Sequence, residues 1–149
     1  MKPLTQVAEI QVSYRPAISN KPIIKSALDA YVVLNEFYPE DRIALQEMFV
    51  VAYLNRSNRV IGVYEVSTGG ITGTVADIRL ILSVALKVAA TSIILSHNHP
   101  SGNLVPSKAD IDLTQKIKEA SRFLDITVTD HLILTYENSY YSMSDEGLL

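Results

Sequence analysis

Residues 96–110, SHNHPSGNLVPSKAD, place two histidines, three serines and an aspartate after an apolar run, TSIIL. The run predicts a strand buried on both faces, and the residues from Ser107 onward predict a helix. Because side chains two apart on a strand share a face, His97 and His99 are expected to converge at the carboxyl end of the strand. Asp110, in the first helical turn, can turn its carboxylate toward them. Two imidazoles, a carboxylate and a water form the ligand set of a catalytic zinc site.

Each of these residues also has an ordinary structural interpretation. Ser107 and Asp110 alone match the S-x-x-D capping box that begins many helices. A strand histidine is commonly structural or exposed. The joint spacing, H-x-H followed by seven residues, S, two residues and D at a strand-to-helix junction, is what favours a metal site.

The elements that must position these residues follow from periodicity and turn signals. Ala8, Ile10, Val12 and Tyr14 alternate with polar residues and predict a strand. Asn20 offers the N-cap of a helix through residues 23–37 that ends near Pro39. Two long strands with an RSN turn between them predict a hairpin. These strands span 44–55 and 59–67.

The second half of the chain predicts two more helices and three more strands. Thr74 and Asp77 suggest a capping box for a helix that runs to about Ala90. The remaining elements are strands at 91–97, 126–135 and 139–144 and a helix from 107 to 123. The predicted fold class is α/β, with a mixed central sheet and flanking helices.

Length and composition limit the class of protein. A chain of 149 residues that is 48% apolar suits a single domain covering residues 1–149. The chain contains no cysteine, so disulfides, thiolate metal sites and cysteine nucleophiles are excluded. Its formal net charge of −3 gives no broad attraction to nucleic acid. The apolar stretch from Val75 to Leu95 is interrupted by charges, so we expect no membrane span and a cytoplasmic location.

The pattern from His97 to Asp110 resembles the signature of the JAMM superfamily of metalloproteases, also called JAB or MPN+. Four segments around this pattern resemble the C-terminal domain of bacterial RadC-like proteins: SHNHPSG, VPSKADIDLT, DITVTDHLIL and YYSMSDEGLL. The resemblance extends from about residue 44 to residue 149 of this chain. This resemblance implies a cytidine deaminase-like JAB/MPN fold. It also implies one zinc ion per chain, with His97, His99 and Asp110 as ligands and Ser107 beside the metal-bound water.

The same resemblance calls for a glutamate as general base on an upstream strand. Glu47 in LQEMFVV aligns with the Glu-x-Phe word of RadC-like domains, and Glu65 in VYEVSTGG is the competing candidate. The structural alternative is that Glu47 precedes the strand and is solvated. His131 in TDHLILT also belongs to the RadC-like pattern, either as a hydrogen-bond partner behind the ligands or in a purely structural role.

Three functions are compatible with these residues. The first is zinc-dependent hydrolysis of a peptide or isopeptide bond, in which zinc lowers the pKa of its bound water from about 15.7 to about 7. Glu47 would move the proton and Ser107 would donate to the oxyanion, in competition with its capping bond. The second is a DNA-associated or nucleic-acid-processing accessory role, which the charge does not support. The third is a non-catalytic interaction module.

The sequence also departs from the RadC-like pattern. The helix-hairpin-helix region usual before this domain has no counterpart in residues 1–43, so we expect a short form of the protein. The expected partner is a peptide or isopeptide substrate such as a small protein tail. Two segments, 7–14 and the YENSYY tail, suggest a homodimer through edge strands.

Overall fold

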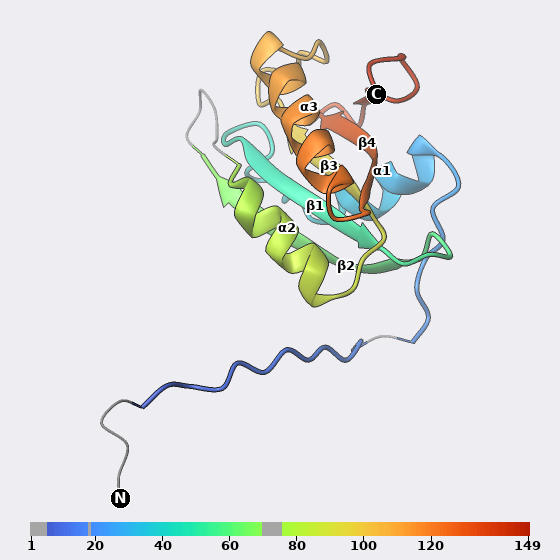
Figure 1. Cartoon of the computed structure of the whole chain (residues 1–149). Helices are drawn as coiled ribbons and strands as arrows, with labels where there is room; N and C mark the ends of the chain where they lie inside the picture. The colour runs from blue at the N-terminus through green and yellow to red at the C-terminus, as the bar shows by residue number, and fades with distance from the viewer. Residues whose placement is uncertain (1–5, 18, 70–75) are drawn as a thin grey trace, which may run out of the picture.

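A five-stranded mixed sheet forms the centre of the protein (Figure 1). The computed structural model describes residues 6–17, 19–69 and 76–149. The strands lie in the order β2-β1-β3-β4-β5; β3 and β4 run parallel and the other neighbours antiparallel. The strand bounds are β1 Met48–Leu54, β2 Val60–Thr68, β3 Ser92–Asn98, β4 Thr127–Leu134 and β5 Tyr140–Ser142. The α/β prediction is confirmed.

The helices of the described residues cover the two faces of the sheet (Figure 1). They are α1 Ala27–Asn35, α2 Ile78–Lys87 and α3 Lys108–Arg122. Ile81 of α2 and Ile117 of α3 share one core cluster with Phe49 and Leu95 of the sheet. Leu34 of α1 belongs to a second cluster on the opposite face, around the even-numbered residues of β1. The sheet is therefore sandwiched between helix layers, and both β1 and β3 are buried along their whole length.

The predicted strand at 8–14 is wrong. Residues 6–17 form neither a helix nor a strand and run away from the sheet (Figure 1). The side chains of Val7, Ile10 and Val12 are 88%, 87% and 75% exposed. An alternating pattern indicates a strand only where a neighbouring strand supplies hydrogen bonds, and none of the described residues of this chain does so here.

The start of the first helix also differs from the prediction. The helix begins at Ala27, and Ser26, not Asn20, is its N-cap, with its hydroxyl accepting from the Asp29 N–H at 3.2 Å. The preceding residues are held extended because Ile23 forms an antiparallel bridge with Arg59. The α2 helix begins after the N-cap Asp77 and ends at Lys87. The predicted cap residue Thr74 lies outside the described residues. Among the described residues, no helix has the length and apolar character needed to cross a bilayer.

Asn98, the last residue of β3, ties the segment before β1 to the histidine strand. Its Oδ1 accepts from the Met48 N–H at 2.7 Å, and its Nδ2 donates to the carbonyls of Ile43 and Gln46 at 2.7 and 2.8 Å. The side chain is completely buried. Because it satisfies three backbone groups at once, this amide fixes where the chain enters β1 and so where Glu47 lies.

We predict that Asn98→Ala lowers the free energy of unfolding by about 3 kcal/mol, because three backbone groups lose their partner in a buried place. Urea unfolding followed by circular dichroism measures this change. Asn35→Ala, a half-exposed amide at the end of α1, is the matched control and should cost far less. Equal losses in the two variants would show that the Asn98 amide contributes no special anchoring.

Candidate metal centre

Three side-chain acceptors converge at the carboxyl end of β3. His97 Nε2 lies 3.0 Å from His99 Nε2, and Asp110 Oδ2 lies 3.3 and 3.2 Å from these two nitrogens. His97 is buried, whereas His99 and Asp110 are partly open to solvent. The three residues that the sequence singled out therefore form one cluster, with one side reachable from outside.

The spacing of the three acceptors suits a tetrahedral metal ion. Zinc ligands lie about 2.0–2.1 Å from the ion, so two ligand atoms at a tetrahedral angle are about 3.3–3.4 Å apart. The separations of 3.0–3.3 Å in this cluster are close to that value. Two nitrogens and one carboxylate oxygen leave the fourth position for water or substrate, as in catalytic zinc sites.

A backbone carbonyl fixes which nitrogen of His99 faces the cluster. His99 Nδ1 lies 2.6 Å from the carbonyl oxygen of Asn103, which can only accept a hydrogen bond. Nδ1 therefore carries a hydrogen, and when the ring is neutral Nε2 presents its lone pair to His97 and Asp110. The loop that carries Asn103 turns back at Gly102, which has φ +84° and donates its N–H to the His99 carbonyl at 3.0 Å.

His97 is oriented by a chain of hydrogen bonds that runs behind the site. Thr114 Oγ1 donates to the Asp110 carbonyl at 2.7 Å, so it can only accept from His131 Nδ1 at 2.6 Å. His131 Nε2 lies 2.7 Å from His97 Nδ1. Burial holds the pKa of His131 well below its ordinary value, so the ring is neutral and Nε2 accepts from His97 Nδ1. The lone pair of His97 Nε2 is thereby directed into the cluster.

A bulge in β4 brings His131 to the correct face of the sheet. The pairing of β3 with β4 shifts between Ile93 and Ile94, so Val128 and His131 both face the α2 and α3 layer although they are three residues apart. Buried Asp130 stabilises the bulge by accepting from the His131 N–H at 2.7 Å and from the hydroxyl of Ser142 at 2.6 Å. The position of His131 therefore depends on a second buried side chain.

The two candidate glutamates lie on opposite faces of the sheet. Glu47 lies immediately before β1, two residues from Phe49, whose ring lies parallel to that of His97 with a centroid separation of 6.2 Å. Glu65 pairs with Val50, a member of the cluster on the α1 face, and its carboxylate accepts from the Thr68 hydroxyl. Glu47 therefore shares the face of the three acceptors, and Glu65 does not.

Burial and neighbouring charges shift the pKa of two carboxylates in the cluster. Burial raises the pKa of Glu47, and the nearby His97 and His99 only partly offset that rise. Burial alone would also raise the pKa of Asp110, but the adjacent His97 and His99 side chains and the Ser107 N–H hold it well below its usual range. Glu47 is thus the more basic carboxylate, and Asp110 stays ionised.

Ser107 forms the N-cap of α3. Its Oγ accepts from the Asp110 N–H at 3.0 Å, while its own N–H donates to Asp110 Oδ2 at 2.8 Å, which completes a capping box. The expected competition between capping and donation does not arise, because the cap uses a lone pair of Oγ and leaves its hydrogen to donate. The same serine also orients the Asp110 carboxylate.

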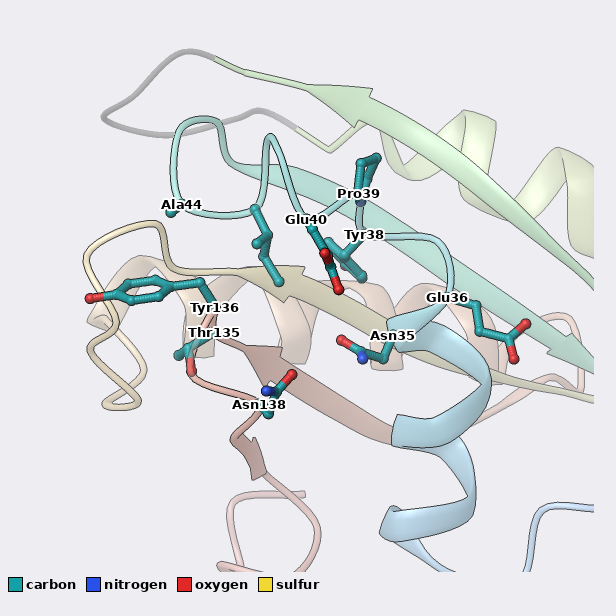
Figure 2. A pocket seen from close by; sticks show the side chains of 10 residues that line it. Asn35, Glu36, Tyr38, Pro39, Glu40, Ala44, Thr135, Tyr136 and Asn138 are labelled. Atoms are coloured by element: carbon teal, nitrogen blue, oxygen red, sulfur yellow. The ribbon is translucent and has the colours of Figure 1, made fainter.

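A hollow of about 640 Å³ lies beside the histidine loop, at the edge formed by the end of α1 and the β4–β5 turn (Figure 2). Its lining includes Glu40, Asn138 and Tyr136, and none of the three acceptors. Tyr136 also contacts the loop, because a Cβ placed on Gly102 would lie 3.3 Å from its ring. Packing against this ring and the positive φ at Gly102 together define the shape of the loop that holds His99.

The sequence did not identify every residue that builds this cluster. Thr114, Asp130 and the anchoring role of Asn98 were missed. Thr114 lies one helical turn after Asp110, so the spacing D-x-x-x-T on the helix was the available signal. The role of Asp130 depends on the β4 bulge, for which the alternating pattern gives no sign.

Comparisons with known proteins agree with this architecture. The profile of the RadC-like JAB domain matches residues 24–148, which includes α1 and so begins before the resemblance noted from about residue 44. A UPF0758 protein of Flavobacterium johnsoniae is 46% identical over 125 residues, covering 84% of this chain and 53% of that protein. A UPF0758 protein of Porphyromonas gingivalis is 38% identical over 148 residues, covering 99% and 65%. The chain therefore spans between about half and two thirds of the length of these relatives.

We predict that Thr114→Val weakens zinc binding by about 10–100-fold, because His131 loses its acceptor and His97 is no longer held in the metal-ready tautomer. Thr114→Ser keeps the hydroxyl and should retain the affinity of the unmodified protein. Competition titration against a chromophoric chelator measures both, and urea unfolding of the metal-free variants corrects for lost stability. Equal zinc affinity in the valine and serine variants would show that the hydroxyl does not orient His97.

Proposed function

The chain belongs to the RadC-like JAB domain family, and from that premise we propose that it is a zinc-dependent hydrolase that cleaves a peptide or isopeptide bond. One observation carries the proposal. The lone pairs of His97 Nε2 and His99 Nε2 and the charge of Asp110 point into the same small volume. Three acceptors so close together repel one another unless a cation lies between them, and the donor set suits zinc.

The protein would contribute ligands and a proton carrier to this chemistry. His97, His99 and Asp110 would hold the ion, which when bound supplies an activated water at neutral pH and polarises the substrate carbonyl. Glu47 lies on the same face, and burial raises the pKa of its carboxyl. A carboxylate of raised pKa is suited to accept a proton from the attacking water and deliver it to the leaving amine.

Ser107 would stabilise the negative charge that develops on the carbonyl oxygen. Its Oγ is fixed by the Asp110 N–H at 3.0 Å, so its O–H vector needs no large reorganisation. A positioned donor of this kind contributes roughly 3 kcal/mol in comparable oxyanion sites. His131 would act from behind, by holding the His97 ring in place.

The proposed class of substrate follows from the type of reaction, because the hollow beside the histidine loop is not lined by His97, His99 or Asp110. A hydrolase of this type takes an amide, and we propose a flexible peptide or a small protein tail as substrate because His99 and Asp110 are partly exposed whereas His97 is buried. A DNA-associated role is the second hypothesis. It ranks below hydrolysis because a formal net charge of −3 provides no general attraction to phosphates. Because the chain spans between about half and two thirds of the length of these relatives, the activity and partners of the whole protein belong to this proposal.

We predict that the purified protein holds about one zinc ion per chain, and that His97→Ala and Asp110→Ala lose it while remaining folded. Elemental analysis beside circular dichroism measures both properties. Absence of zinc after dialysis against a zinc buffer would overturn the metal site.

We predict that Glu47→Gln retains zinc but loses about 10²–10⁴-fold in the rate of amide cleavage, because the amide cannot carry the proton. The matched control is Glu65→Gln, which changes the same chemical group on the opposite face of the sheet and should keep full activity. Fluorogenic peptides and isopeptide-linked peptides serve as substrates. A zinc-loaded protein that cleaves none of them, or equal losses in both variants, would contradict the proposed reaction.

We predict that Ser107→Ala lowers the free energy of unfolding by about 1 kcal/mol through loss of the cap. The rate of cleavage should fall much further, by roughly 10²-fold or more, because the oxyanion loses its donor. Urea unfolding and steady-state kinetics on the same preparation separate these effects. A rate loss of only a few fold would limit Ser107 to capping.

A further inference from the structure

We propose that residues 6–17 add a strand to the free edge of β2 in a second copy of this chain. The proposal goes beyond the hydrolytic function and does not depend on it. It rests on the apolar face of this segment, on an incompletely covered sheet edge and on an apolar groove beside that edge.

The segment has the pattern of a half-buried strand, but none of the described residues of its own chain pairs with it. Ala8, Ile10, Val12 and Tyr14 alternate with polar residues, and all four side chains are exposed. Figure 1 shows the segment extended and leading away from the sheet. A row of apolar side chains in this conformation gains free energy only when a sheet accepts it.

Within residues 60–65 of β2, the described part of the chain covers the outer edge at the beginning only. The Val60 N–H donates to the Pro22 carbonyl and the Ile24 N–H donates to the Asn58 carbonyl, both at 2.9 Å, so residues 22–24 pair with residues 58–60. Beyond this bridge, none of the described strands lies beside the outer edge of residues 61–65. Edge strands of this kind are templates for pairing with another chain.

An apolar groove of about 390 Å³ runs beside this edge on the α1 face. Val32 of α1 and Phe37, just after the end of that helix, line one side of it, and Ile61 and Val63 of β2 line the other. Val32 and Phe37 are exposed although both are large and apolar. A strand placed on β2 would lay one of its faces over this groove, and the face with Ile10 and Val12 supplies the complementary apolar surface.

The geometry points to a second copy as the occupant. Residues 22–24 pair with β2 of their own chain. The apolar segment 6–17, which precedes them in the sequence, leads away from that sheet. Twelve extended residues reach about 40 Å, far enough to lie along the edge of a neighbouring molecule. Because each copy offers one segment and one edge, a reciprocal exchange closes a symmetric dimer.

Light scattering on the full chain tests the exchange. The protein should be a dimer at micromolar concentration, and the double variant I10D/V12D should be a monomer with unchanged circular dichroism. Gln11→Asp adds a charge to the opposite face of the same segment and should remain a dimer. A monomeric full chain, or a dimer that persists in I10D/V12D, would overturn the proposal.

Cross-linking identifies which copy is paired, because the natural chain contains no cysteine. Under oxidation, I10C/V63C should form a covalent dimer, whereas I10C/K116C, whose second cysteine lies on exposed α3, should form far less. A cross-linked I10C/V63C monomer would show that the segment folds back on its own sheet and would overturn the exchange. Equal dimer yields in both variants would also overturn it, since random collision would then account for the bond.

Discussion

The arrangement of the candidate centre depends on the direction of hydrogen bonds that end on backbone carbonyls. A carbonyl cannot donate, so the Asp110 and Asn103 carbonyls determine where the hydrogens of Thr114, His131, His97 and His99 must lie. No hydrogen remains to lie between the two Nε2 atoms and the Asp110 carboxylate when both rings are neutral. The fold thereby builds a cluster of acceptors that a positive charge between them would stabilise.

The mixed sheet is what makes such a chain of bonds possible. Parallel pairing of β3 with β4 places His97 and His131 on neighbouring strands, and α3 crosses the same face with Thr114 one turn after Asp110. The buried Asp130 side chain stabilises the bulge where β4 departs from regular pairing. The buried Asn98 side chain fixes the point where the chain enters β1. Both of these interior side chains are paired within the protein and fix the position of the backbone, whereas the buried hydroxyls of Tyr31 and Ser92 have no hydrogen-bond partner among the described residues.

The sequence was sufficient for the parts of the fold that rest on local pattern. Buried β3, the capping box of α3 and the H-x-H spacing follow from residue types a few positions apart, and each was predicted. The face of the sheet on which Glu65 lies could not be predicted by counting residues along β2. Two irregularities in the β1–β2 pairing change the alternation of side chains between the two faces. The bulge that turns His131 inward is a property of two strands together. The strand predicted at 8–14 failed for the related reason that strand formation needs a partner.

Asp110 has a consequence for the energetics of the whole domain. The same carboxylate closes the first turn of α3 through Ser107 and contributes the acidic member of the acceptor cluster. Unfolding this helix end would therefore also dismantle the proposed ion site. By mass action, a folded state that alone binds an ion gains about 4.1 kcal/mol when the free ion is a thousandfold above its dissociation constant. If the proposed site binds metal, the melting temperature of this protein would report the free metal in its surroundings.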